Sequence, residues 1–276
     1  MTPTIGVFDS GFGGLTVLRA LVARLHGARF AFLGDTARLP YGSKSRRTIA
    51  RYAAQSAQFL VREQGAEFLV IACNTASALA LDAIQDAVPV PVLGVIEPGA
   101  TAALAASRTG DVLVIATDAT VHSHAYAAAC RAHGLRALEK ACPLLVPLVE
   151  EGWTDHPVTA QVIQIYLDEL TAEAAAQSLN PDTLVLGCTH YPLLRPILER
   201  VLARAVPAGI RVIDSAEAAA ETALRQFGAQ IPPSADAAPQ TLLRCFATDS
   251  VDKFERLGSR VLGRPVGKVE LVDLGG

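Results

Sequence analysis

The sequence predicts an α/β protein with mostly parallel sheets, and three observations support this prediction. Short apolar segments of strand length alternate along the chain with longer segments of helical periodicity. The strand segments are apolar along their whole length, which is typical of parallel strands that helices cover on both faces. The chain has 276 residues, which is long enough for two domains.

The expected elements follow one another in a regular order. Buried strands are expected at residues 4–8, 29–33, 68–72, 91–95, 111–116, 182–187 and 211–213. Helical periodicity lies between them, over residues 46–65, 75–87, 157–177 and 193–205. The Pro- and Ala-rich residues 229–241 predict a surface loop, and the segment after it predicts a strand, a helix and a strand.

The composition excludes several classes of protein. Hydrophobic residues make up 51% of the chain and charged residues 18%, which is incompatible with a disordered chain. The net charge of −3 is not that of a nucleic-acid-binding protein. No apolar stretch of about 18 residues predicts a membrane span, and the first residues do not resemble a signal peptide. We therefore expect a cytoplasmic protein.

The cysteines are odd in number and far apart in the sequence. There are five, with no Cys-x-x-Cys pair, and this pattern indicates reduced thiols. His190 lies only two positions from Cys188, which is not the spacing of a structural zinc site. We interpret Cys130, Cys142 and Cys245 as small buried apolar residues.

Cys73 and Cys188 differ from the others because they occupy matching segments, "FLVIACNTAS" and "LVLGCTHYP". Each follows an apolar strand and precedes a helix, at the strand end where α/β sheets bind ligands. The helix dipole there is expected to lower the pKa of a thiol. Two thiols on either side of one carbon could exchange its proton, one as base and the other as acid. A disulfide between them and a metal site are the alternative uses.

Three further segments carry candidate polar groups. "GVFDSGFGGLTVL" lacks the glycine of a dinucleotide fingerprint, since Thr16 stands there, and it is not a P-loop. Its Asp9 either caps a helix or faces a pocket. "GDTARLPYGSKS" is either an ordinary loop or an anion-binding one. In "CPLLVPLVEEGW", Glu150 and Glu151 either end a solvated helix or enter a pocket.

Taken together, these segments resemble the glutamate racemases, which belong to the cofactor-independent aspartate/glutamate racemase superfamily. The resemblance covers most of the chain and rests on "GVFDSGFGGLTVL", "GDTARLPYG", "IACNTASALAL", "GVIEPGA", "CPLLVPLVEEG" and "LVLGCTHYPLL". It implies two similar α/β domains with the active site in the cleft between them. The first domain would comprise residues 1–97 and 210–276, and the second residues 98–209.

The resemblance also implies an activity and its requirements. The enzyme would interconvert L- and D-glutamate, without pyridoxal phosphate or a metal, and supply D-glutamate for peptidoglycan. It would be a homodimer with no nucleic-acid or membrane partner.

The resemblance assigns roles to individual residues. Cys73 and Cys188 match the catalytic thiols, with Cys73 acting on D-glutamate and Cys188 on L-glutamate. Asp9 matches the helper carboxylate of the first thiol. His190 and Glu150 match the helpers of the second, with Glu151 as the alternative to Glu150. The positions that match substrate-binding residues are Asp9, Ser10, Pro40, Tyr41, Gly42, Asn74, Thr75, Thr117, Thr120, Thr189 and His190.

The sequence departs from the family pattern at one position and leaves two alternative functions. The family commonly has Gly-Thr-x-x-Thr after the fifth strand, whereas Ala116 stands in the glycine position here, with Thr117 and Thr120 retained. The chain could be an aspartate racemase, although His190 after Cys-Thr favours glutamate. It could also be a catalytically silent ligand- or gyrase-binding protein, although the presence of both Cys73 and Cys188 favours an enzyme.

Overall fold

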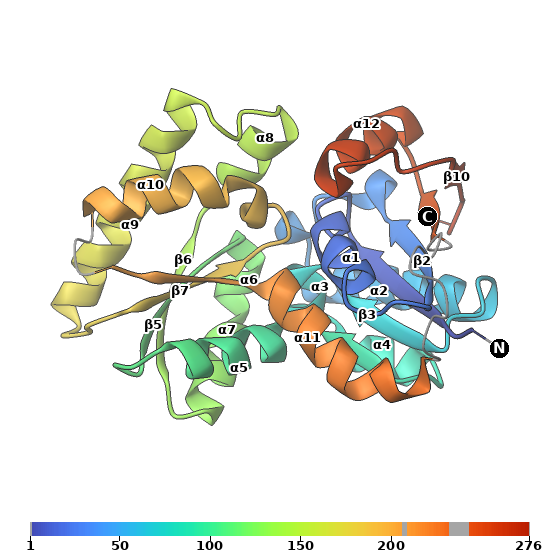
Figure 1. The fold of residues 1–276 in the computed structure, drawn as a ribbon, viewed down its shortest axis with the longest axis horizontal. Coiled ribbons are helices and arrows are strands. Elements are labelled where there is room, and N and C mark those ends of the chain that lie inside the picture. The colour runs from blue at the N-terminus through green and yellow to red at the C-terminus, as the bar shows by residue number, and fades with distance from the viewer. Residues whose placement is uncertain (1, 206–208, 232–242, 276) are drawn as a thin grey trace. The chain divides into compact units, whose positions relative to one another are not determined.

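The computed structural model describes residues 2–205, 209–231 and 243–275 (Figure 1). Contacts within the chain divide it into two units. Unit 1 comprises Met1–Val95 and Ala219–Gly276, and unit 2 comprises Ile96–Ala218. Each unit contains its own sheet, and all paired strands in both sheets run parallel. The predicted α/β class with parallel sheets is confirmed.

The sheet of unit 1 has the strand order β10-β9-β2-β1-β3-β4. Its central strands are almost completely buried, which explains why their sequences are apolar without alternation. The strands are β1 (Thr4–Asp9), β2 (Arg29–Gly34), β3 (Phe68–Ile71), β4 (Val92–Gly94), β9 (Leu243–Ala247) and β10 (Val269–Leu271).

Helices cover both faces of this sheet. On one face, Leu33 and Leu69 of the sheet share a hydrophobic cluster with Ile49 of α2 (Arg46–Arg62). On the other face, the ring of Phe32 lies 5.8 Å from that of Phe254 in α12 (Val251–Leu262). The other helices near this sheet are α1 (Leu15–Val22), α3 (Asn74–Leu79), α4 (Leu81–Ala87) and α11 (Ser215–Phe227), with 3-10 turns η1 (Thr36–Arg38), η2 (Tyr41–Ser43) and η4 (Gly228–Gln230).

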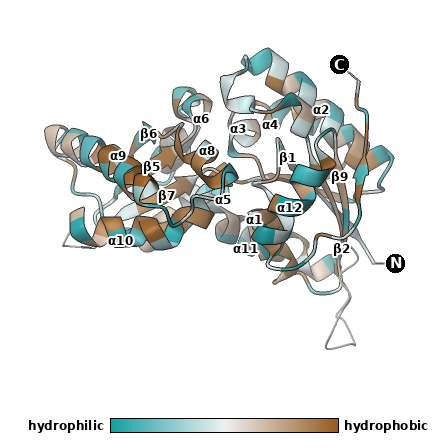
Figure 2. Cartoon of the chain, turned by 90° about the horizontal axis from the view of Figure 1, so that it is seen from above, coloured by the Kyte–Doolittle hydropathy of each residue, from teal (hydrophilic) through white to brown (hydrophobic). Residues whose placement is uncertain are grey.

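The sheet of unit 2 has the order β6-β5-β7-β8. Leu113 and Leu184 of its central strands share one hydrophobic cluster with residues of α9 and α10. In Figure 2, α9 and α10 carry both hydrophobic and hydrophilic stretches, as expected of helices that cover a sheet. The strands are β5 (Asp111–Ala116), β6 (Arg136–Ala141), β7 (Thr183–Gly187) and β8 (Arg211–Asp214). The helices are α5 (Ile96–Ala106), α6 (Asp118–Ser123), α7 (Ala125–Ala132), α8 (Leu145–Glu150), α9 (Pro157–Ala176) and α10 (Arg195–Ala205), with the 3-10 turn η3 (Tyr191–Leu194).

The structure differs from the sequence-based expectation in two places. The strand β6 was not predicted, because its sequence RALEKA carries three charged residues and only Leu138 within it is buried. It is an edge strand of the sheet, where polar side chains are tolerated. The domain boundary expected near residue 210 precedes β8, whereas β8 pairs with β7 in the sheet of unit 2.

The C-terminal expectation is confirmed where the structure describes it. The strand β9, the helix α12 and the strand β10 follow one another as expected. Of the expected surface loop at 229–241, residues 232–241 lie outside the described residues. In the described part of the chain, no helix has the length and apolarity needed to cross a membrane.

Candidate active site

Cys73 lies at the junction of β3 and α3 in unit 1, as the sequence predicts. Its backbone is extended, and it is the N-cap residue of α3, whose Ala76 N–H donates to the Cys73 sulfur at 3.4 Å. The Cys73 thiol in turn donates to Oγ of Ser10 at 3.4 Å. Only 5% of Cys73 is exposed. Two hydrogen bonds therefore hold this buried thiol in a defined orientation.

Asp9 and Ser10 reach Cys73 because β1 and β3 are neighbours. The parallel register pairs Phe8 with Ile71, so the residues after these two strands leave the same edge of the sheet. The Asp9 side chain is buried, and its Oδ2 accepts a hydrogen bond from Gly11 N–H at 3.0 Å. Two of the predicted site residues thus lie beside the first thiol.

The pKa of Cys73 moves in the direction opposite to the sequence-based expectation. Burial, followed by the negative charge of Asp9, raises the pKa of the Cys73 thiol to about 12. The hydrogen bonds of Cys73 with Ser10 and Ala76 act in the other direction but are outweighed. Cys73 is therefore a protonated thiol at neutral pH.

The loop between β2 and α2 supplies a third predicted cluster, at Pro40, Tyr41 and Gly42. Tyr41 begins η2 and is buried in the same hydrophobic cluster as Cys73. Its hydroxyl donates to Oδ2 of Asp35 at 2.5 Å, and burial together with Asp35 raises the pKa of Tyr41 far above its usual value. Asp35 was not among the predicted site residues. The available signal was a carboxylate placed directly after a strand, inside the motif that also contains Tyr41.

Asn74 and Thr75 complete the group in unit 1. Both belong to the first turn of α3 and are nearly completely buried. The first N–H groups of a helix have no partner within the helix and can bind a carboxylate. Unit 1 therefore brings together a thiol, a carboxylate, hydroxyl groups and backbone donors.

Cys188 occupies the corresponding position in unit 2, directly after β7. It is 5% exposed, and its sulfur lies 3.9 Å from Nδ1 of His190. On the other side of the imidazole, Nε2 lies 3.4 Å from Oε1 of Glu150 at the end of α8. Glu151 is exposed. The carboxylate that pairs with His190 is therefore Glu150.

Tyr191 anchors the segment that contains Cys188 and His190. Its buried hydroxyl donates to the carbonyl oxygens of Ala116, at 3.1 Å, and Cys142, at 2.9 Å. These carbonyls lie at the ends of β5 and β6. A Tyr191 N–H bond to the Cys188 carbonyl, at 3.1 Å, closes the turn. The thiol and the imidazole are thus tied to the sheet through one side chain.

The predicted threonines of unit 2 lie at the same edge of its sheet. The register pairs Ala116 with Gly187, so Thr117 and Cys188 both follow the ends of adjacent strands. The hydroxyl groups of Thr117 and Thr120 are 2.9 Å apart, and Thr117 is the N-cap of α6. Ala116 is buried in β5, where its methyl group is accommodated. Thr189 is also buried.

The remaining cysteines fit their predicted structural role. All five cysteines are free and buried thiols. Within the described residues, no group of three or more His, Cys, Asp and Glu side chains could hold a metal ion. At the predicted site, Cys73 has the Asp9 carboxylate nearby, and Cys188 is linked to the Glu150 carboxylate through His190. Such groups are suited to acid–base chemistry.

Comparison with known proteins assigns the chain to a family. The family model for Asp/Glu/Hydantoin racemase matches residues 5–223. The chain is 54% identical to a glutamate racemase from Koribacter versatilis, over 99% of this chain and 98% of that protein. The structure resembles that of glutamate racemase isoform RacE1 from Bacillus anthracis, with a TM-score of 0.88, 35% identity and coverage of 99% and 98% of the two chains.

A second solved structure is similar to the same extent. The glutamate racemase from Francisella tularensis, determined in complex with D-glutamate, has a TM-score of 0.85 and 32% identity, and the match covers 99% of this chain and 98% of that chain. The chain therefore belongs to the Asp/Glu/hydantoin racemase family and, within it, to the glutamate racemases, which are isomerases.

Proposed function

We propose that the protein interconverts L- and D-glutamate, with Cys73 and Cys188 as the two acid–base groups at the α-carbon. The observation that carries this proposal is the equivalent placement of two buried thiols. Cys73 lies two residues after β3, Cys188 lies directly after β7, and each thiol has a carboxylate within its own unit. The names of the relatives support glutamate as the substrate, as does the D-glutamate in the Francisella tularensis structure.

In this mechanism the substrate carboxylates bind to the polar groups around each thiol. In unit 1 the candidates are Ser10, the Tyr41–Gly42 backbone, and the first turn of α3 with Asn74 and Thr75. In unit 2 they are Thr117, Thr120, Thr189 and His190. Backbone N–H groups at the start of a helix favour an anion and hold it in a fixed position. A fixed position for the carboxylates also fixes the α-carbon for proton transfer.

The proton transfers follow from the protonation state of Cys73. With its pKa raised to about 12, Cys73 begins as the thiol. A thiolate at Cys188 removes the α-proton of L-glutamate, leaving a carbanion and a Cys188 thiol. Cys73 then donates its proton to the opposite face, which gives D-glutamate and a Cys73 thiolate. The reverse reaction starts from that state, so atoms and charge balance in both directions.

The helper groups adjust the two thiols differently. Burial and, after it, the negative charge of Asp9 raise the pKa of Cys73, which makes the Cys73 thiolate a strong base toward D-glutamate. His190, paired with Glu150, can hold a proton near Cys188 and return it. We further propose that the enzyme is a cytoplasmic homodimer whose D-glutamate enters peptidoglycan.

A circular-dichroism assay tests the reaction and its substrate. Purified protein without added cofactor is incubated with L-glutamate and, in parallel, with L-aspartate. Loss of the L-glutamate signal is expected. Racemisation of aspartate alone would replace the substrate assignment, and no reaction with either amino acid would favour the binding-protein alternative.

Solvent deuterium incorporation tests the two thiols separately. In Cys73→Ala, exchange of the α-proton is expected from L-glutamate but not from D-glutamate, and Cys188→Ala should show the opposite pattern. Wild-type exchange from both enantiomers in both variants would exclude the two-thiol mechanism.

A further inference from the structure

Asp35 is a completely buried carboxylate at the carboxyl end of β2. It follows Gly34 directly and accepts three hydrogen bonds from side chains. The Tyr41 hydroxyl donates to Oδ2 at 2.5 Å. Arg38 Nε and the Thr248 hydroxyl both donate to Oδ1, each at 2.9 Å. Three donors converge on one carboxylate. Two come from the N-terminal segment of unit 1 and one from its C-terminal segment.

Arg38 attaches this carboxylate to α2. Its guanidinium lies over the ring of Tyr52, 4.4 Å from the centroid, and donates to Gln55 at 2.6 Å. Only 10% of the Arg38 side chain is exposed, so the ion pair with Asp35 is largely shielded from water. A buried carboxylate without such partners would be costly, because its desolvation would not be compensated.

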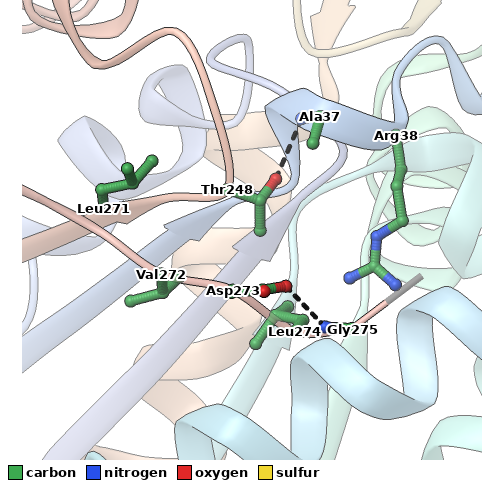
Figure 3. Close-up of a pocket in the computed structure, with 8 residues that line it drawn as sticks. All are labelled: Ala37, Arg38, Thr248, Leu271, Val272, Asp273, Leu274 and Gly275. Atoms are coloured by element: carbon green, nitrogen blue, oxygen red, sulfur yellow. Dashed lines mark hydrogen bonds between the residues drawn. The ribbon is translucent and has the colours of Figure 1, made fainter.

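Thr248 attaches the same carboxylate to the segment after β9. Besides donating to Asp35, its hydroxyl accepts a hydrogen bond from Ala37 N–H at 2.9 Å (Figure 3). At the neighbouring residues, the Thr36 hydroxyl donates to the Asp249 carbonyl and accepts from Asp249 N–H. The loop after β2 is therefore hydrogen-bonded to the C-terminal part of unit 1.

These contacts lie beside a pocket of unit 1. Thr248, Ala37 and Arg38 line a pocket of about 380 Å³ together with Leu271–Gly275 (Figure 3). The Tyr41 ring packs instead within the cluster that contains Cys73. Tyr41 thus belongs both to the Asp35 network and to the cluster that contains the thiol.

We propose that Asp35 is a positioning residue that holds the Tyr41–Gly42 backbone in place for a substrate carboxylate. The proposal rests on the proposed function, in which this loop binds glutamate. Asp35 acts through Tyr41 and does not touch the substrate. Because Tyr41 begins η2, a displaced Tyr41 side chain also displaces the N–H groups of the turn.

An asparagine cannot replace this carboxylate. All three partners are donors toward Asp35, whereas an amide offers one acceptor oxygen and one NH₂ group. If the oxygen remains with Arg38 and Thr248, the NH₂ group faces the Tyr41 hydroxyl, whose proton then needs another acceptor in a buried site. The guanidinium of Arg38 also loses its counter-charge.

The test compares Asp35→Asn and Thr248→Val with two controls. Thr248→Ser keeps the hydroxyl and serves as the rescue variant. Asp182→Asn changes another buried carboxylate, which lies at the opposite end of β7 from Cys188. The Asp182 carboxylate accepts hydrogen bonds from Ser107 and Arg108, at 2.8 Å each. This variant controls for a general loss of stability.

Steady-state kinetics with L- and D-glutamate give the first measurement. In Asp35→Asn, KM is expected to rise about ten-fold for both enantiomers with kcat within about three-fold, because the loop binds ground state and transition state alike. Thr248→Val should show the same pattern more weakly, and Thr248→Ser and Asp182→Asn should keep the wild-type KM. An unchanged KM in Asp35→Asn, or a loss of kcat alone, would overturn the proposal.

Hydrogen–deuterium exchange gives a second measurement that does not depend on activity. Asp35→Asn and Thr248→Val should exchange the amides of residues 36–44 at least about ten-fold faster than wild type, and Asp182→Asn should not. Unchanged exchange there would also overturn the positioning role. A wild-type protein that does not racemise glutamate would overturn the proposed function instead, and the exchange result would still report on the network.

Discussion

The Glu150 carboxylate lies 3.4 Å from Nε2 of His190 in unit 2. Both side chains are largely buried, with 17% and 12% exposed, so solvent screens their interaction only in part. Since the other imidazole nitrogen lies 3.9 Å from the Cys188 sulfur, the carboxylate can fix the orientation and the proton of the ring that faces the thiol.

Replacing Glu150 by Gln is therefore expected to impair the Cys188 half of the reaction. The amide keeps the shape but removes the charge that stabilises a protonated His190. We expect kcat to fall by about a hundred-fold, the lower end of what a positioned general acid or base contributes. The measurement is kcat against pH in both directions. Glu151→Gln is the matched control, because Glu151 is exposed. Equal losses of kcat in the two variants would contradict the assignment of Glu150 as the partner of His190.

Tyr191→Phe is expected to destabilise unit 2 and the segment that carries Cys188. Without the hydroxyl, the buried carbonyls of Ala116 and Cys142 each lose a donor. The expected loss is about 1–3 kcal/mol in the free energy of unfolding, measured by urea titration. Tyr166→Phe is the control, because Tyr166 is only partly buried. A Tyr191→Phe protein as stable as the control would show that these bonds contribute nothing.

Gly14→Ala is expected to displace Asp9. A Cβ atom at position 14 would lie 2.5 Å from Cβ of Asp9 and 3.0 Å from that of Ala72, and neither neighbour can move away freely. Overpacking of this kind costs about 1–3 kcal/mol. Activity should fall with stability, because Asp9 lies beside Cys73. Gly228→Ala meets only the Leu224 side chain and should have little effect on either measurement. Full activity in Gly14→Ala would argue against a role for the position of Asp9.

Cys73 is expected to make stability depend on alkaline pH. Its pKa is raised from 9.0 to about 12 in the folded protein, mainly by burial. The protonated Cys73 thiol therefore contributes fully to the free energy of unfolding below pH 9. This contribution is lost as pH rises toward 12, because the unfolded chain releases the thiol proton at a lower pH than the folded protein does. Within that window, one such group contributes a slope of about 1.4 kcal/mol per pH unit.

The measurement is the free energy of unfolding at pH 8 and pH 10 for wild type and Cys73→Ser. Because a serine hydroxyl does not titrate in this range, the variant should lose less stability over the interval. Cys245→Ser is a useful comparison, since burial also raises the pKa of Cys245 to about 12, away from the predicted site. Parallel pH profiles for wild type and Cys73→Ser would contradict the raised pKa.

Much of the architecture could be predicted from the sequence because the relevant signals are local. The continuous apolar runs within β1, β3, β5 and β7 follow from burial between two layers of helices. In a parallel sheet, residues after such strands lie at one edge, which is why Cys73 and Cys188 could be selected. The edge strand β6 could not be found in this way, since exposure removes the apolar pattern.

The sequence by itself determined the α/β class, the parallel strands and the two thiols that follow them. Only the tertiary structure decided which carboxylate lies beside which side chain. Glu150, not Glu151, pairs with His190, and Asp35 accepts a hydrogen bond from Tyr41. It also decided that the pKa of Cys73 rises, since burial and the charge of Asp9 outweigh the hydrogen bonds with Ser10 and Ala76. The physical reason is that hydrophobic periodicity is set by neighbours in the chain. Hydrogen-bond partners, desolvation and pKa are set by residues that only the folded chain brings together.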